Sequence, residues 1–267
     1  MTLRARKLSV TLGGRAVLSD IDFVATRGEV TCLVGKNGEG KTTLLRSLCG
    51  IARPGSGTVE LDDRDLFALT PRERARQVGA LFSAPDTTFG FTVRELVAMG
   101  RYPHLGRAFE GEADRRATED ALDALELEAL AEAPIHTLSA GERQRVGIAR
   151  LLCQAPLAYL FDEPTSNLDP AHVERFVRVA RGLAGRGAIA VCVVHDLDLA
   201  LRLADRLVVL HAGRVLGDGP PGEVLTPELV KTVWGVEAVR VDALTGRPSL
   251  VVTALPPMSQ AARNNTG

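Results

Sequence analysis

The chain has 267 residues, of which 45% are hydrophobic and 24% are charged, so its composition is that of an ordinary globular protein. The formal net charge of −1 gives no general attraction to nucleic acid or anionic lipid, and we expect no nucleic-acid partner. No apolar run approaches the roughly 20 residues of a membrane helix, and residues 1–10 lack the apolar stretch of a secretory signal. We therefore expect a cytoplasmic protein that can still dock on a membrane protein.

The first third of the chain predicts strands around one helix. Residues 1–30 alternate apolar and polar side chains in short runs, which is typical of an antiparallel sheet. "EVTCLVG" then predicts a buried strand, and "KTTLLRSLCG" predicts a helix that stops at Gly50. "GTVELDD" predicts a further strand.

From about residue 92 to residue 155 the pattern becomes helical. Within "ADRRATEDALDALELEAL", the apolar side chains that share one helix face are Ala117, Ala121, Leu122 and Leu125. Strands and helices then alternate through "LAYLF", a helix from Pro170, "AIAVCVV", a helix from Asp196, and "RLVVL". Nearly continuous apolar strands with helical crossovers imply a parallel sheet that is buried on both faces. "HAGR" predicts a tight hairpin turn after the last of these strands.

The four cysteines do not form a recognisable metal or disulfide pattern. None belongs to a C-x-x-C pair, and each has apolar neighbours in the sequence. We interpret them as small buried side chains rather than as a zinc site or a disulfide framework. They are Cys32, Cys49, Cys153 and Cys192.

Residues 35–42, "GKNGEGKT", match the phosphate-binding pattern G-x-x-x-x-G-K-[ST] between a predicted strand and a predicted helix. Backbone N–H groups of such a loop converge on phosphate oxygens, and the helix dipole points at the same place. Lys41 is suited to the β- and γ-phosphates, and the Thr42 hydroxyl to Mg²⁺. The alternative, a glycine-rich turn that binds nothing, does not explain the strand and helix on either side. The predicted nucleotide-binding residues here are Gly35, Lys36, Asn37, Gly38, Glu39, Gly40, Lys41, Thr42 and Thr43.

Two further strand ends carry side chains suited to phosphate chemistry. In "LAYLFDEP", a buried strand delivers Asp162 and Glu163 to the edge where parallel sheets bind ligands. Asp162 is suited to holding Mg²⁺ through water, and Glu163 to orienting or deprotonating an attacking water. His195 ends the strand in "VCVVHD" and is placed to approach a γ-phosphate, although a lone histidine is more often structural.

Residues 138–150, "LSAGERQRVGIAR", resemble the signature of ABC ATPases, which usually begins Leu-Ser-Gly-Gly. An ordinary capped helix would explain these residues alone, but not together with the other motifs in the family's order. The resemblance runs from about residue 3 to residue 252 and implies a head-to-tail homodimer, in which the signature of one subunit closes over ATP held by the other. It assigns nucleotide contacts to Ser139, Gly141 and Glu142, and it identifies "SNLD" as the D-loop that ends in Asp169.

A narrower resemblance concerns two other segments. "TVRELVAMGRYPHLGR" and the ending "VWGVEAVRVDALTGRPSLVV" look like the ATPase subunits of importers for iron–siderophore, haem and cobalamin. Such importers contain two ATPase subunits, two membrane permease subunits and a separate substrate-binding protein. The implied function is ATP hydrolysis that energises uptake, with the subunit held on the inner face of the membrane by the permease.

Two other functions stay open from the sequence. A soluble ABC ATPase of DNA repair or translation usually has a coiled-coil insertion or two motif sets, and this chain has one set and no heptad run. A regulatory subunit that hydrolyses ATP poorly is suggested by departures from the family pattern. Leu12 stands where an adenine-stacking aromatic is usual, and Ser83 where a glutamine contacts Mg²⁺ and water. In the phosphate loop, Lys36 and Glu39 replace the usual proline and small residue, and we expect their side chains to point outward.

The expected fold is α/β, with a P-loop NTPase core and a mainly parallel sheet, an N-terminal antiparallel β subdomain and an inserted α-helical subdomain. Residues 1–255 are expected to form one ABC ATPase domain. Its nucleotide-binding core would comprise residues 1–82 and 156–235, its helical subdomain residues 83–155, and its short C-terminal extension residues 236–255. Residues 256–267 are expected to be a frayed tail.

Overall fold

The computed structural model describes residues 1–82, 90–106, 111–242 and 248–254. The first of its sheets is antiparallel and has the strand order β2-β1-β4-β5. This confirms the antiparallel sheet that residues 1–30 predicted. Its strands are β1 (Thr2–Leu12), β2 (Arg15–Thr26), β4 (Ser56–Leu61) and β5 (Arg64–Asp65).

The second sheet has the order β10-β9-β3-β8-β7-β6 and is parallel except for β10, which runs antiparallel to β9. Every residue of β3, β7 and β8 is buried, as their apolar sequences predicted. The hairpin turn predicted at "HAGR" joins β9 to β10. The strands are β3 (Val30–Val34), β6 (Val78–Leu81), β7 (Ala158–Asp162), β8 (Ile189–Val193), β9 (Arg206–His211) and β10 (Arg214–Gly219).

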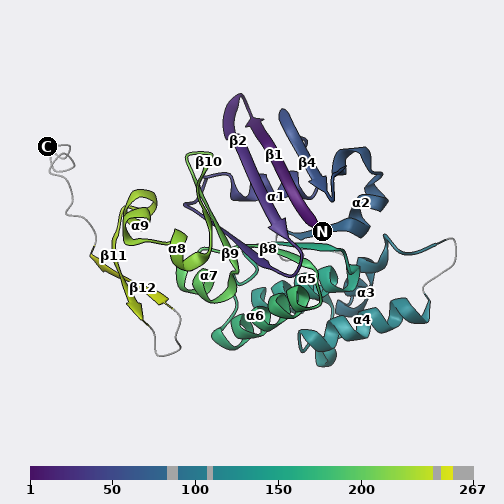
Figure 1. The fold of residues 1–267 in the computed structure, drawn as a ribbon. Coiled ribbons are helices and arrows are strands. Elements are labelled where there is room, and N and C mark those ends of the chain that lie inside the picture. The colour runs from purple at the N-terminus through teal and green to yellow at the C-terminus, as the bar shows by residue number, and fades with distance from the viewer. Residues whose placement is uncertain (83–89, 107–110, 243–247, 255–267) are drawn as a thin grey trace, which may run out of the picture.

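Side chains of the second sheet point alternately into two apolar clusters. On one face, Leu33 and Leu160 pack with β1, β2 and helix α1 (Lys41–Leu48). On the other face, Cys32 and Phe161 pack with helices that include α5 (Ala140–Gln154), α6 (Pro170–Gly185) and α7 (Leu197–Leu203). The sheet is therefore a middle layer, with the antiparallel sheet and α1 on one side and the helices on the other (Figure 1).

Several helices begin at a residue whose side chain satisfies the first backbone N–H groups. Thr70, Thr92 and Ser139 each form a capping box with a glutamate three residues later, and such a cap contributes about 1 kcal/mol. The remaining helices are α2 (Pro71–Gln77), α3 (Val93–Ala98), α4 (Glu112–Ala124), α8 (Pro221–Val224) and α9 (Pro227–Trp234). Short 3₁₀ turns are η1 (Leu66–Ala68), η2 (Met99–Arg101), η3 (Glu128–Leu130) and η4 (Ile135–Thr137).

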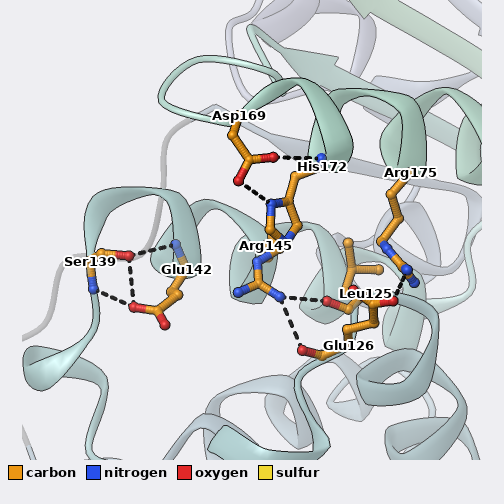
Figure 2. Close-up of polar contacts among 8 residues, drawn as sticks. All are labelled: Leu125, Glu126, Ser139, Glu142, Arg145, Asp169, His172 and Arg175. Atoms are coloured by element: carbon orange, nitrogen blue, oxygen red, sulfur yellow. Dashed lines mark hydrogen bonds and ion pairs between the residues drawn. The ribbon is translucent and has the colours of Figure 1, made fainter.

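Helix α4 ends earlier than its sequence pattern suggested. Ala121, Leu122 and Leu125 are buried as predicted, but the helix stops at Ala124 and Glu126 takes a left-handed conformation with φ 52°. The buried guanidinium of Arg145 donates to the carbonyl oxygens of Leu125 and Glu126, at 2.9 and 3.0 Å (Figure 2). This side chain occupies carbonyls that a longer helix would have paired internally.

All four cysteines are buried, as expected. After α9, strands β11 (Glu237–Asp242) and β12 (Pro248–Ala254) pair antiparallel, beyond the second sheet in Figure 1. The expected tail, residues 256–267, lies outside the described residues. None of the helices in the described ranges is long and apolar enough to cross a membrane.

Candidate nucleotide site

The predicted phosphate loop joins β3 to α1, and two of its glycines are required by close packing. Gly35 has φ 151°, and a Cβ atom there would lie 2.3 Å from the carbonyl oxygen of Leu210. Gly40 has φ 94°, and a Cβ atom there would lie 2.7 Å from a side-chain carbon of Leu18. A side chain at Gly35 would clash with backbone, and the left-handed conformation of Gly40 disfavours any larger residue, so the sheet and β2 hold the loop closely.

Lys41 begins α1 and turns its side chain back over the loop. Its ammonium donates to the carbonyl oxygens of Gly35 and Lys36, at 2.8 and 2.7 Å. The residue is only 5% exposed, and burial lowers the pKa of its ammonium, although nearby carboxylates such as Glu163 oppose this shift. A buried cation is stabilised by a nearby negative charge, which a bound phosphate would provide.

Thr42 and Asp162 meet although they lie 120 residues apart. The Thr42 hydroxyl donates to Asp162 Oδ2 at 2.7 Å, while Asp162 Oδ1 is buried and has no hydrogen-bond partner. Burial raises the pKa of the Asp162 carboxyl, and the Thr42 hydrogen bond opposes the shift. The structure thus presents a carboxylate oxygen without a partner beside a hydroxyl.

Glu163 follows β7 in a left-handed conformation with φ 51°, which is uncommon outside glycine and often marks a functional position. Its backbone is held from both sides: its N–H donates to the Val193 carbonyl, and its own carbonyl accepts from Gln144 and Ser166. Its side-chain Oε1 lies 2.5 Å from Nε2 of His195, which follows β8. The structure therefore brings together the two residues predicted to be catalytic.

A pocket of about 240 Å³ opens between the phosphate loop and Glu163. Val17 of β2 also lines it, and sequence analysis missed this residue because nothing in the β2 pattern marks its place in the fold. Gln144, which is 2% exposed and supports the Glu163 carbonyl at 3.3 Å, was likewise missed. The pocket is lined by Val17, Asn37, Gly38, Gly40, Lys41, Thr42, Thr43 and Glu163.

The predicted signature residues lie at the start of α5, and they are occupied with one another (Figure 2). The Ser139 hydroxyl and backbone N–H both donate to Glu142 Oε2 at 2.7 Å, and the Glu142 N–H donates to the Ser139 oxygen at 3.3 Å. The hydroxyl of Ser139 lowers the pKa of Glu142. A Cβ atom on Gly141 would lie 2.8 Å from the carbonyl oxygen of Asn167, so the predicted D-loop packs directly on this glycine.

Asp169 ends the predicted D-loop and caps α6. Its carboxylate accepts from the His172 backbone N–H and lies beside His172 Nδ1, both at 2.9 Å (Figure 2). The backbone N–H of His172 is the main cause that lowers the pKa of Asp169. Neither Asp169 nor the signature residues line the phosphate-loop pocket in the described part of the chain.

The four departures from the family pattern, Leu12, Ser83, Lys36 and Glu39, have different outcomes. Leu12 is 51% exposed at the end of β1 and does not line the pocket. Ser83 lies outside the described residues. The expectation that Glu39 points outward is wrong, because its carboxylate turns to the β9–β10 hairpin and accepts from the Ala212 N–H. Lys36 is exposed, as expected.

Comparison with known proteins agrees with this geometry. The family model described as ABC transporter matches residues 18–166, more than half of the chain. A hemin import ATP-binding protein, HmuV, of Rhodococcus jostii is 45% identical over 235 residues, covering 88% of this chain and 80% of that protein. HmuV of Myxococcus xanthus is 42% identical over 259 residues, covering 94% and 96%. A cobalamin import ATP-binding protein, BtuD, of Halobacterium salinarum is 38% identical over 268 residues, covering 100% and 67%.

Solved structures with the same fold are ATP-binding cassettes. A chain of a metal-chelate type ABC transporter in an inward-facing conformation superposes with a TM-score of 0.81 at 25% identity, covering 95% of this chain and 98% of that one. The dimeric bacterial ABC transporter cassette MJ0796 superposes with a TM-score of 0.75 at 26% identity, covering 82% and 98%. These likenesses confirm the α/β P-loop fold that the sequence predicted. From the matched family model, the identities to import ATPases and these superpositions together, the chain belongs to the ABC transporter family.

Proposed function

We propose that this chain is the Mg²⁺-dependent ATP-hydrolysing subunit of an ABC importer for haem or a cobalamin-type chelate. The observation that carries the proposal is a pair of contacts made by residues that line the pocket, Thr42 with Asp162 and Glu163 with His195. These contacts place a cation-binding pair and an acid–base pair at the carboxyl ends of adjacent parallel strands.

The residues present fit a magnesium ion. Asp162 Oδ1 is a buried oxygen without a partner, and Thr42 Oγ1 is beside the same carboxylate. Magnesium prefers oxygen ligands and usually keeps several waters and phosphate oxygens, so two protein groups suffice. When bound, the ion neutralises charge on the transferred phosphoryl group. In the described residues there is no cluster of three or more His, Cys, Asp or Glu side chains that could hold a metal by itself.

The roles of the remaining side chains follow from their positions. Lys41 would exchange its backbone carbonyl partners for phosphate oxygens, with the N–H groups of residues 35–43 around them. Glu163 would orient and deprotonate the attacking water, and its strained backbone is held in place by Gln144 and Val193. His195 would hold the Glu163 carboxylate and approach the γ-phosphate. The Glu163–His195 contact favours hydrolysis over a purely regulatory role.

The signature and D-loop would complete the site of a second subunit. In this chain Ser139, Glu142 and Asp169 cap their own helices and lie outside the lining of the pocket. A homodimer in which the start of α5 faces the partner's phosphate loop would give these groups a nucleotide to contact. The similarity to a cassette solved as a dimer supports this arrangement.

Transport is proposed from the named relatives. The curated relatives are import ATP-binding proteins for hemin and for cobalamin, which favours a tetrapyrrole or corrin over a siderophore. The subunit would be held at the inner face of the membrane by permease subunits, and a substrate-binding protein would deliver the chelate on the opposite side.

The proposal is tested by reconstitution in liposomes with the permease and binding protein of the same organism. We expect ATP-dependent uptake of hemin or cyanocobalamin and no uptake with Glu163→Gln. A matched control is Glu223→Gln, which changes an exposed glutamate of α8. An assembled complex that hydrolyses ATP but moves neither compound, or moves only a ferric siderophore, would overturn the substrate assignment. A complex without Mg²⁺-dependent hydrolysis would overturn the whole proposal.

A further inference from the structure

Glu39 is an unusual residue for the inside of a phosphate loop, and it is well anchored. Its side chain is only 15% exposed. Its Oε2 accepts a hydrogen bond from the backbone N–H of Ala212, in the turn between β9 and β10. Its Oε1 lies 3.3 Å from Nδ1 of His211. A carboxylate that is largely removed from water needs a hydrogen-bond donor, and here the Ala212 N–H is that donor, whereas His211 Nδ1 makes no hydrogen bond within the described residues.

The same turn also contacts β2, the strand that contributes Val17 to the pocket lining. The carbonyl of Gly213 accepts from the Ser19 N–H of β2 at 2.9 Å. A Cβ atom on Gly213 would lie 2.6 Å from the carbonyl oxygen of Val17, and Val17 lines the nucleotide pocket. The turn therefore contacts both β2, which contributes Val17, and the phosphate loop, which contributes Glu39.

We infer that Glu39 is a positioning residue that fastens the phosphate loop to the β9–β10 turn and so sets its distance from Val17. This inference rests on the proposed function, because it concerns the same nucleotide site. The carboxylate does not have to touch the nucleotide. It acts through the backbone of the loop, whose N–H groups must converge to bind phosphate.

A simple charge effect makes the opposite prediction. The negative charge of Glu39 lies close enough to Lys41 to oppose the lowering of its pKa, so it also lies near the expected triphosphate. If repulsion were its whole effect, removing the charge by any substitution would tighten nucleotide binding. If Glu39 is an anchor, the result depends on whether the new side chain can still accept the Ala212 N–H.

Two variants of the full chain separate these accounts. Glu39→Ala removes both the charge and the acceptor, whereas Glu39→Gln removes the charge and keeps an acceptor oxygen of the same reach. Glu223→Ala is the control for loss of an exposed glutamate. The measurements are the Kd for Mg-ATP and Mg-ADP by fluorescence titration, and KM and kcat for ATP hydrolysis.

We expect Glu39→Ala to weaken nucleotide binding by roughly three- to tenfold, the range that the net contribution of one ordinary hydrogen bond implies. The loss should appear in KM rather than in kcat, because Asp162, Glu163 and His195 are not displaced. Glu39→Gln should bind nucleotide as well as the unchanged chain, or more tightly. If both variants tighten binding, or if neither changes it, the inference is overturned.

Amide hydrogen exchange gives a second readout that does not depend on nucleotide. The Ala212 amide should be protected in the unchanged chain and in Glu39→Gln, and should exchange on the order of tenfold faster in Glu39→Ala. Equal exchange in all three proteins overturns the anchor. A chain that binds no ATP at all contradicts the proposed function instead, so the two failures are distinguishable.

Discussion

The two helix starts that carry the nucleotide motifs differ in how their polar groups are satisfied. At the start of α1, side chains from several elements converge, and Asp162 Oδ1 is buried without a partner. At the start of α5, Ser139 and Glu142 satisfy each other through a capping box. The α1 end therefore has a buried polar atom without a hydrogen-bond partner, whereas the polar side chains of Ser139 and Glu142 at the α5 end are paired.

This difference is what we expect if the α1 end binds nucleotide within the subunit and the α5 end contacts the nucleotide of a second subunit, as proposed above. Buried polar atoms without partners are costly, so the α1 end would gain most from binding the proposed phosphate and Mg²⁺. The α5 end has little free-energy cost without a ligand, because the side chains of Ser139 and Glu142 already hydrogen-bond to each other. A subunit that must separate from and rejoin its partner would need this arrangement.

The largest effect is expected from the α1 end, with Glu163→Gln. Loss of the proposed base should lower the rate of hydrolysis by roughly 10²–10⁴-fold while ATP still binds. The uncleaved nucleotide should then hold two subunits together, and size-exclusion chromatography with ATP should show a dimer. A variant that hydrolyses ATP at the original rate and stays monomeric with ATP would contradict the assigned role.

Asp162→Asn should lower hydrolysis on the order of a hundredfold, because the change weakens the proposed magnesium ligand. The same change should stabilise the nucleotide-free chain. Burial raises the pKa of Asp162 above its ordinary 3.8, so the folded chain binds more protons than the unfolded chain between the two pKa values. The free energy of unfolding therefore falls as pH rises through that range. Asparagine does not ionise, so Asp162→Asn does not lose this stability.

Thermal unfolding without nucleotide checks this prediction at two pH values. The Tm difference in favour of Asp162→Asn should be larger at pH 7 than below the ordinary carboxyl pKa of 3.8. Equal Tm differences at both pH values would show that the buried carboxylate carries no cost.

At the α5 end, Gly141→Ala should reduce hydrolysis by roughly ten- to a hundredfold, because its methyl group would press on the Asn167 carbonyl and displace the D-loop. The affinity of the monomer for ATP should not change, since Gly141 does not line the pocket. Ala140→Gly, which restores the usual family residue next to it, is the matched control. A higher Kd for ATP in monomeric Gly141→Ala would contradict the view that the start of α5 takes no part in nucleotide binding within one subunit.

The smallest effect is expected from Leu12→Tyr. Leu12 is half exposed at the end of β1, where the family usually has an aromatic that stacks on adenine. A ring there should tighten ATP binding by roughly 0.5–1.5 kcal/mol, or about two- to tenfold. Titrations with ATP and with inorganic triphosphate distinguish base stacking from other causes, since only ATP should gain affinity.

Much of the nucleotide end could be predicted because its signals are local. A buried strand, a glycine-rich turn and a helix adjoin in the sequence, and backbone conformation alone makes that unit bind phosphate. Asp162, Glu163 and His195 could be found for a similar reason, since parallel strands bring their carboxyl ends to one edge. In the structure, Asp162 accepts a hydrogen bond from Thr42, and Glu163 lies beside His195.

The contacts that support these residues could not be predicted. Val17 and Gln144 join the site from elements whose sequence patterns only say that they are buried or amphipathic. The end of α4 depends on Arg145, whose carbonyl partners lie about 20 residues away. Such partners depend on which loops the packing brings together, and residue pattern alone does not carry that information.

The sequence by itself determined the class of the protein, the strands and helices around its nucleotide motifs, and the residues that we propose to face phosphate. Only the tertiary structure decided which distant groups contact one another. Glu39 contacts the β9–β10 turn, Gly141 packs against the D-loop, and Glu163 lies beside His195. The reason is physical. Local motifs follow from hydrogen bonding within a few residues, whereas contacts across the fold depend on packing that buries both partners at once.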